Sequence, residues 1–209
     1  HGSNCSQGLS YFEGKRNDNW HEYGVTCSGR SILGLVDSNQ ARIALGNALK
    51  KRFMTIGGGP WLVQDGGPPV CNAQYDADRD KTIFSTGEEF DRNVESWCTD
   101  TRRHTLVGID QDGKTLFVGI TTASGATITQ TAQWLKDRGA YNVMKLDSGG
   151  STGLYHNGAL VGGSTSRLIP NHLAIIVHSD GGGYGDICMN NQQPRTDEVI
   201  LFDEPNFGS

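Results

Sequence analysis

The residues most able to do chemistry in this sequence form one short run, residues 147–152 (DSGGST). The run follows the largely apolar segment 143–146 (VMKL), so its aspartate stands where a strand is expected to end. In sheets covered by helices, ligands often bind beyond the strand ends. The two glycines lack Cβ atoms, so their N–H groups can approach an anion closely, and the two hydroxyl residues add donors. The run predicts an anion-binding site beside a carboxylate; the alternative is a glycine-rich turn capped by the aspartate.

Three other segments carry residues suited to ligand binding. The run 57–60 (GGGP) adjoins an expected strand, where glycines let the backbone approach either a ligand or a neighbouring element. The triplet 181–183 (GGG) follows an expected strand, and its alternative to ligand binding is a flexible loop. The triplet 102–104 (RRH) leads into a strand, and an arginine fork binds phosphate or carboxylate in a bidentate way. Basic triplets are also common on solvated surfaces.

Two familiar chemistries fit this run poorly. No Gly-Lys-Ser/Thr follows the glycines at 149–150, which excludes a Walker A loop. Residues 149–153 (GGSTG) have the spacing G-x-S-x-G, but the sequence places no histidine beside Ser151 to activate it, so serine-hydrolase chemistry is not the expectation.

A calcium site is the alternative interpretation of the polar segment 71–86. Asp76, Asp78 and Asp80 place carboxylates at alternate positions, as in a calcium-binding loop. An EF-hand requires Gly at its sixth position and Glu at its twelfth, where this chain has Lys81 and Gly87. We therefore expect a solvated acidic loop here, and no metal or cofactor elsewhere.

The first half of the chain is expected to supply strands and one helix. The pattern predicts a strand near 32–36 and a helix over 39–52, with Ser38 as its N-cap. A strand over 61–63 is closed by the turn 65–68 (DGGP).

The second half carries the clearest signals. Segments 105–109 and 115–120 form a predicted hairpin with Asp-Gly as its turn signal. Thr127 and Gln130 make a capping box at the start of a helix that Gly139 ends. A strand over 143–146 follows, then a hairpin over 155–160 turning at Asn-Gly, and an apolar strand over 173–177. A helix that feeds a strand favours an α+β (α/β-like) single domain, a mixed β-sheet covered by a few helices.

Composition excludes several classes of protein. The chain has 209 residues, enough for one core, and 29 of them are glycine without a G-x-y period, which excludes collagen. A net charge of −5 without a dense Lys/Arg cluster argues against a nucleic-acid partner. The longest apolar run, 173–177, is far shorter than the roughly 20 residues of a membrane span.

Five cysteines at wide intervals favour two disulfides in an oxidising compartment, so we expect a secreted or luminal protein. Buried thiols are the alternative. Local pairing would join Cys5 to Cys27 and Cys71 to Cys98, leaving Cys188 over.

The two ends of the chain are set apart from the main domain. Residues 1–3 (HGS) have the composition of a purification-tag remnant, and the domain is expected over 4–198. Segment 199–209 resembles the opening strand of a βγ-crystallin-like module, with an ordinary last strand as the alternative.

In order along the chain, these motifs resemble the phosphodiester glycosidase family. The matching pieces are GGPWLV at 58–63 with Asp-Gly after it, HTLVGI at 104–109, the Thr-started helix, LDSGGST at 146–152, and Arg167 four residues before Asn171. The resemblance covers roughly residues 40–178. It departs from the family at Ser148, where glycine is usual, and at His104, where arginine is usual.

The resemblance implies a site, which we state as an expectation. Its substrate-binding residues would be Gly58, Gly59, Pro60, Arg103, Thr105, Gly149, Gly150, Ser151, Thr152, Arg167 and Asn171. Asp147 and His104 would be catalytic, and Asp65 or Asp110 would supply a second carboxylate.

The implied activity is hydrolysis at the anomeric carbon of a sugar, with a sugar-1-phosphodiester as the expected substrate. Such cleavage passes through an oxocarbenium-like state, and a phosphomonoester leaves readily because its second pKa is about 6. The chemistry therefore calls for an anion holder and a carboxylate near the anomeric carbon. The alternatives are a glycoside hydrolase acting on a polysaccharide and a non-catalytic carbohydrate-binding module, so in each case the partner is a carbohydrate or glycan-phosphate.

Overall fold

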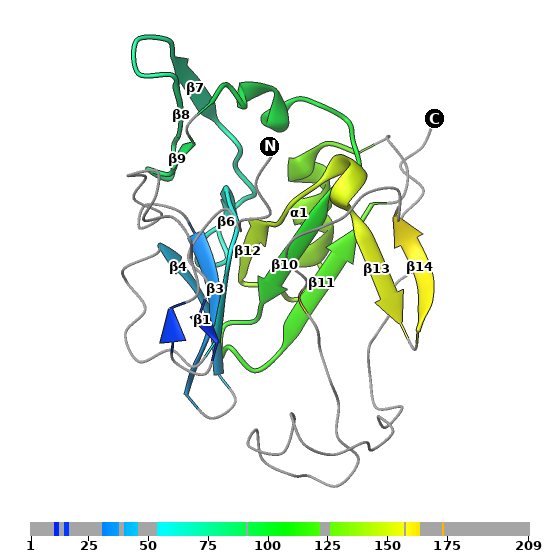
Figure 1. Cartoon of the computed structure of the whole chain (residues 1–209). Helices are drawn as coiled ribbons and strands as arrows, with labels where there is room; N and C mark the ends of the chain where they lie inside the picture. Colours follow the sequence, from blue (N-terminus) through cyan, green and yellow to red (C-terminus); the bar gives the residue numbers. More distant parts are fainter. Residues whose placement is uncertain are drawn as a thin grey trace, which may run out of the picture. The chain divides into compact units, whose positions relative to one another are not determined.

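A computed structural model of the chain describes residues 11–12, 15–16, 31–37, 40–45, 54–90, 92–121, 126–156, 158–163 and 173. The chain divides into two units, His1–Pro170 and Asn171–Ser209, and all described helices and strands belong to the first. Strands dominate the described residues, with one α-helix among them (Figure 1). The only described residue of the expected strand 173–177 is Leu173, which is not in a strand.

A four-stranded sheet, here called the central sheet, holds the residues of greatest interest. Its order is β11 (Leu116–Ile120), β10 (Thr105–Ile109), β12 (Asn142–Lys145) and β6 (Trp61–Val63), and every neighbouring pair is antiparallel. The predicted strands 61–63 and 143–146 and the hairpin over 105–120 are confirmed.

The helix α1 (Ile128–Lys136) begins as the sequence predicts. The Thr127 side chain accepts from the Gln130 N–H at 3.3 Å, and the Gln130 side chain accepts from the Thr127 N–H at 2.8 Å. The helix packs its apolar face against the central sheet, and Gly139 follows its end with φ +105°. The resulting core contains Leu62, Val63, Leu106, Ile128, Ala132, Leu135, Ala140 and Val143.

The expected mixed sheet is wrong for the described strands. α1 does connect two strands that run in the same direction, β11 and β12, since both are antiparallel to β10. However, β10 lies between them, so they are not neighbours and no parallel ladder forms. A helix that connects two strands in the sequence does not reveal whether a third strand lies between them in the sheet.

A second sheet is built from the beginning of the described chain. Its order is β2 (Lys15–Arg16), β1 (Tyr11–Phe12), β5 (Met54–Gly57), β3 (Ser31–Asp37) and β4 (Gln40–Leu45). It meets the β10–β11 turn, where the Ala41 N–H donates to the Gly113 carbonyl at 2.7 Å. β3 confirms the strand predicted near 32–36.

The helix expected over 39–52 is wrong where the structure describes that segment. Residues 40–45 form β4, which pairs antiparallel with β3. Ala41 and Ile43 are buried while Arg42 between them is exposed, an alternation of period two that suits a half-buried strand. The helix-forming composition was therefore overridden by pairing with a neighbouring strand. Ser38 and residues 46–52 lie outside the described residues.

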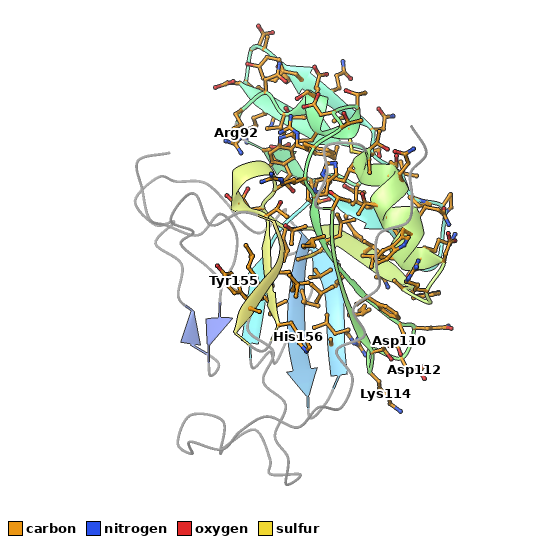
Figure 2. All side chains as sticks on the ribbon, turned by 90° about the vertical axis from the view of Figure 1, so that its right-hand side faces the viewer. Arg92, Asp110, Asp112, Lys114, Tyr155 and His156 are labelled. Carbon is orange, nitrogen blue, oxygen red and sulfur yellow. A yellow bond between two sulfur atoms is a disulfide. The ribbon has the colours of Figure 1, made fainter. Side chains whose placement is uncertain are left out.

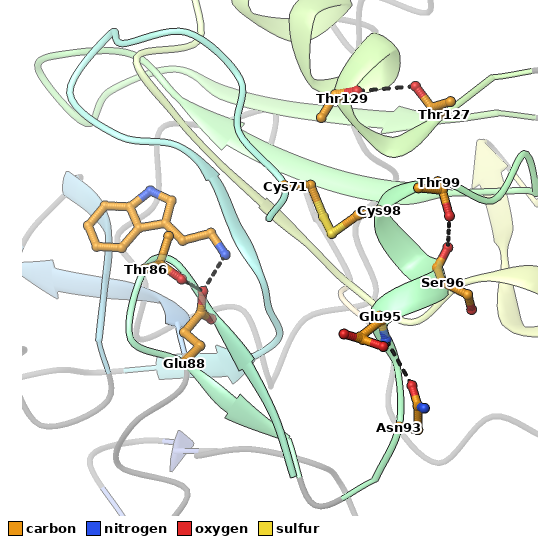
Figure 3. The surroundings of a disulfide bond; sticks show 11 residues. Cys71, Thr86, Glu88, Asn93, Glu95, Ser96, Cys98, Thr99, Thr127 and Thr129 are labelled. Atoms are coloured by element: carbon orange, nitrogen blue, oxygen red, sulfur yellow. Dashed lines mark hydrogen bonds between the residues drawn. A yellow bond between two sulfur atoms is a disulfide. The ribbon is translucent and has the colours of Figure 1, made fainter. Parts of the chain in front are cut away.

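The segment expected as a polar loop is largely a small sheet, β7 (Ala73–Asp76), β8 (Lys81–Phe84) and β9 (Glu89–Phe90). It surrounds a small core of Phe84, Phe90 and Val94. The disulfide Cys71–Cys98 joins this sheet's start to the 3-10 helix η3 (Glu95–Cys98), as predicted (Figure 3). Cys5 and Cys27 lie outside the described residues.

The last described elements are a 3-10 turn and a hairpin. The turn η4 (Gly149–Ser151) is followed by β13 (Gly153–His156) and β14 (Ala159–Gly163), which pair with each other (Figure 1). This confirms the predicted hairpin. Among the described residues, none of the helices has the length and apolar character needed to cross a membrane.

Candidate functional site

Three backbone segments meet where β12 ends. The Leu146 N–H donates to the Thr105 carbonyl at 2.8 Å, which ties the strand to the start of β10. On its other side, Lys145 exchanges bonds with Gly59 and Pro60, at 2.8 and 3.1 Å. We call the region formed by residues 58–60, 103–105 and 145–152 the Asp147 end of the central sheet. It gathers most of the residues expected to form a site.

The glycines of the 58–60 segment serve a close approach to β12. A Cβ on Gly58 would lie 2.3 Å from the Lys145 carbonyl oxygen, which only glycine avoids. Trp61, the residue after the 58–60 segment, is held by Glu88. The buried carboxylate of Glu88 accepts the Trp61 N–H at 2.6 Å and the Thr86 hydroxyl at 2.7 Å (Figure 3). Of the two alternatives for these glycines, packing against a neighbouring strand accounts for Gly58.

The run 149–152, expected to form an anion nest, has three of its four N–H groups bonded to carbonyls. The Gly149 N–H donates to the Arg103 carbonyl at 2.9 Å, while Ser151 and Thr152 donate to the carbonyls of Ser148 and Gly149. These three N–H groups are used inside the protein. Gly149 has φ +65° and open space around its missing Cβ, so its glycine is required by the turn conformation.

Hydroxyl groups line the inner side of this turn. The Thr105 hydroxyl donates to that of Thr152 at 3.3 Å, and Thr152 is fully buried. The Ser151 hydroxyl is also buried and makes no hydrogen bond within the described residues. The turn therefore places one unused polar group at the Asp147 end.

His104 lies at this end as well, with its side chain completely buried. Its Nε2 lies 3.2 Å from the Ala126 carbonyl oxygen, which can only accept, so Nε2 carries the proton. Burial, and then the charge of Lys145, lowers the pKa of this imidazole to about 4. His104 is thus a buried imidazole whose Nε2–H is bonded to the backbone, and its expected catalytic role stays a prediction.

Lys145 is the residue at this end that sequence reasoning missed. It closes β12, whose four residues are all buried, and only 3 % of its surface is exposed. Its ammonium donates to the Leu146 carbonyl at 2.9 Å and lies 4.1 Å from the centroid of the Trp97 ring. The sequence did carry a signal for Lys145, because it is a charged residue within an otherwise apolar strand segment. Burial of an ammonium costs free energy, so a lysine at such a position needs an explanation.

Asp147 is exposed at the end of β12. Its Oδ1 accepts the N–H of Ser148 at 2.9 Å, which orients the carboxylate. The side chain is thus held at the surface, directly after a buried strand. It is a carboxylate available to a ligand from solution.

The two candidates for a second carboxylate lie at the opposite end of the sheet. The Asp65 N–H donates to the Asn142 side chain at 3.1 Å, and Asn142 pairs with Ile109, the residue before Asp110. Asn142 begins β12 and Asp147 follows it, a separation of about 16 Å along a strand. Neither carboxylate lies with Asp147.

Asp110 has a local role in the β10–β11 turn. Its Oδ1 accepts the N–H groups of Lys114 and Thr115 at 2.8 and 3.1 Å. Partial burial opposes ionisation of this carboxyl, but the hydrogen bonds from Thr115, Lys114 and Gly113 prevail and lower its pKa. Figure 2 shows Asp110 together with Asp112 and Lys114 at this end.

Two of the three carboxylates named for a calcium site, those of Asp76 and Asp80, accept hydrogen bonds at the β7–β8 turn. Asp76 Oδ1 accepts the N–H groups of Asp78 and Arg79, at 3.1 and 3.2 Å, and Asp80 accepts the Tyr75 hydroxyl at 2.6 Å. Within the part of the chain that the structure describes, no three His, Cys, Asp or Glu side chains are grouped to hold a metal ion.

Three arginine and asparagine candidates remain. Arg103 lies at the Asp147 end, where its carbonyl accepts the Gly149 N–H. Arg167 and Asn171 lie outside the described residues.

Comparison with known proteins identifies a family and a fold. The family model for phosphodiester glycosidase matches residues 6–176. The catalytic domain of zebrafish N-acetylglucosamine-1-phosphodiester alpha-N-acetylglucosaminidase, auto-inhibited by its pro-peptide, has 20 % identity and a TM-score of 0.52 over 80 % of this chain and 55 % of that one. This likeness shows a shared fold.

Other comparisons add little. A hypothetical protein from Synechocystis aligns with a TM-score of 0.39 and 20 % identity, over 66 % of this chain and 31 % of that one. The chain thus spans about half of the zebrafish structure and a third of the Synechocystis one. A search of curated proteins finds no match.

Proposed function

Because the chain belongs to the phosphodiester glycosidase family, we propose that it hydrolyses the bond between the anomeric carbon of a sugar and a phosphodiester oxygen. The observation that carries this proposal is the position of Asp147. It is an exposed carboxylate, oriented by the Ser148 N–H, at the end of a buried strand beside the 58–60 segment and the η4 turn. A secreted or luminal location, which suits a chain with a disulfide, belongs to the same proposal.

The proposed reaction is a substitution at carbon. The C1–O bond to the phosphate breaks and its electron pair stays on that oxygen, which releases a phosphomonoester dianion. Water supplies the new hydroxyl at C1 and gives up one proton. Because the second pKa of the departing phosphate is about 6, it needs no proton from an acid at neutral pH.

Asp147 has one of two roles in this reaction, each of which needs only its carboxylate. It either attacks C1 to form a glycosyl-enzyme intermediate or takes the proton from the attacking water. Both roles require contact with solvent and substrate, which the exposed position of Asp147 provides.

The proposed binding residues follow from the same end of the sheet. Arg103 is proposed to bind the phosphate, with the hydroxyls of Ser151 and Thr105 toward the substrate. The N–H groups of Gly149, Ser151 and Thr152 are not included, because each is already bonded within the protein.

Hydrolysis of a sugar-1-phosphodiester in ¹⁸O-labelled water tests the proposal. We expect the label in the released sugar and none in the phosphomonoester, since C1 is the atom attacked. Label in the phosphate would show attack at phosphorus and contradict the proposal. A parallel reaction with a plain aryl glycoside should be much slower; faster turnover of that substrate would favour a glycoside hydrolase.

A further inference from the structure

The burial of a lysine next to the candidate site calls for an explanation. Lys145 lies two residues before Asp147, is 3 % exposed, and follows the buried apolar residues Val143 and Met144. Removing an ammonium from water costs several kcal/mol unless partners compensate. An apolar side chain would fill the same position in β12 without that cost, so stability alone does not explain the lysine.

The ammonium is held in one place by two contacts. It donates to the Leu146 carbonyl at 2.9 Å, and the Trp97 ring lies against it with a centroid distance of 4.1 Å. The carbonyl belongs to the peptide that leads directly into Asp147. Lys145 therefore bears on the position of the catalytic candidate through the backbone.

The charges around Lys145 come from each neighbouring part of the fold. Its own segment supplies the carboxylate of Asp147. The segment before β10 supplies the neutral His104 and also Arg102, which is paired with Asp100. Arg92 lies 5.5 Å from the centroid of the same Trp97 ring. The 58–60 segment is uncharged.

These surroundings set the proton affinity of the lysine. Burial lowers the pKa of Lys145 to about 8, the carboxylate of Asp147 opposes that shift, and Arg102 and Arg92 add to it. The side chain is thus an ammonium at neutral pH and loses its charge within one to two pH units above it.

We propose that Lys145 is a specificity-determining residue, whose ammonium, held by the Leu146 carbonyl and the Trp97 ring, supplies a positive field that favours a departing phosphate over a neutral leaving group. This inference rests on the proposed function. A fixed charge in a partly dry region acts strongly on charge that develops in the transition state, and hardly on a neutral leaving group.

Lys145→Met and Lys145→Arg test the proposal, with Lys114→Met as the matched control in the exposed turn at the far end of the sheet (Figure 2). We expect Lys145→Met to lower kcat/KM by about 10- to 100-fold for a sugar-1-phosphodiester, mostly through kcat, and by less than about 3-fold for the matching alkyl glycoside, whose oxygen departs as a neutral alcohol. Lys114→Met should change neither. Equal losses on the two substrates would overturn the proposal.

The pH profile gives a second readout. In the wild type, kcat/KM for the phosphodiester should fall as the pH rises through about 8, because the lysine loses its charge. Lys145→Arg should retain activity and lack this fall, since an arginine stays charged. A wild type without the fall, or the same fall in Lys145→Arg, would overturn the proposal even if Lys145→Met does not fold.

Binding of inorganic phosphate, measured by calorimetry, separates this proposal from the proposed function. We expect Lys145→Met to weaken phosphate binding at least about 10-fold relative to Lys114→Met. Unchanged phosphate binding would overturn the role of Lys145. A wild type that binds phosphate in this Lys145-dependent way and turns over neither substrate would contradict only the proposed reaction.

Discussion

At the scale of single residues, His104 illustrates how burial fixes a protonation state. Its Nε2–H is used by the Ala126 carbonyl, and its Nδ1 is buried without a hydrogen-bond partner among the described residues. A proton on Nδ1 would create a buried N–H without an acceptor in the described part of the chain, and the charge of Lys145 opposes it as well. The folded protein therefore resists protonation of this side chain.

Acid should destabilise the protein through His104. Its pKa is about 4 in the folded protein, against an ordinary histidine value of 6.5, so the unfolded chain takes up the proton first as the pH falls. The stabilisation that the neutral His104 contributes to the folded protein is complete above pH 6.5 and is lost as the pH falls toward 4. Between about pH 7 and about pH 4.5 we expect a loss of about 2.5 kcal/mol from this group.

Urea unfolding at the two pH values measures this contribution. His104→Gln should lose about 2.5 kcal/mol less than the wild type on acidification, since glutamine does not titrate. His156→Gln, on the separate β13–β14 hairpin labelled in Figure 2, should follow the wild type. Identical pH dependence in His104→Gln and the wild type would refute the account of His104.

The sequence could predict Asp147 as a carboxylate at a strand end, because an apolar run followed by Asp-Ser-Gly-Gly is visible in one dimension. It could not predict the use of the neighbouring N–H groups. The Gly149 N–H is used by the Arg103 carbonyl, which lies 46 positions away in the sequence. Lys145 escaped notice for a similar reason, since only tertiary packing places it under Trp97.

At the scale of elements, η3 connects the small β7–β9 sheet with the candidate site. It supplies Trp97, which covers the Lys145 ammonium, and it ends in Cys98, which is bonded to Cys71. Phe90 packs edge-on against the same ring at 5.2 Å. The disulfide therefore anchors the element that shields Lys145.

Replacing both cysteines, as Cys71→Ala/Cys98→Ala, should lower the free energy of unfolding by about 3.5 kcal/mol. The estimate is the loop-closure entropy for a separation of 27 residues. Chemical denaturation with and without a reducing agent measures it. The reductant should destabilise the wild type by more than it destabilises the double variant, which keeps Cys5 and Cys27; a double variant as stable as the oxidised wild type would refute this role.

Elements with local signals were the predictable ones. The capping box of α1, the hairpin over 105–120 and strand β6 each depend on residues close in sequence, and all are confirmed. β4 was predicted as a helix because its composition favours one, whereas its pairing with β3 and its contact with Gly113 decide its structure. Non-local pairing of this kind is not visible in a single segment.

At the scale of the whole described unit, the central sheet separates two groups of polar residues. One end holds Lys145, Asp147 and the η4 turn, and the other holds Asp65, Asp110 and the β10–β11 turn. The sequence offered carboxylates from both groups for one site, because antiparallel strand order, which decides their separation, could not be derived from it.

The central claim is that the Asp147 end performs hydrolysis at an anomeric carbon, and one measurement tests it most directly. It is kcat/KM of Asp147→Asn on a sugar-1-phosphodiester, compared with Asp112→Asn in the exposed turn at the opposite end (Figure 2). We predict a loss of about 1,000-fold for Asp147→Asn with an unchanged unfolding transition, and less than about 2-fold for Asp112→Asn. A folded Asp147→Asn variant that retains kcat/KM close to the wild-type value would contradict the claim.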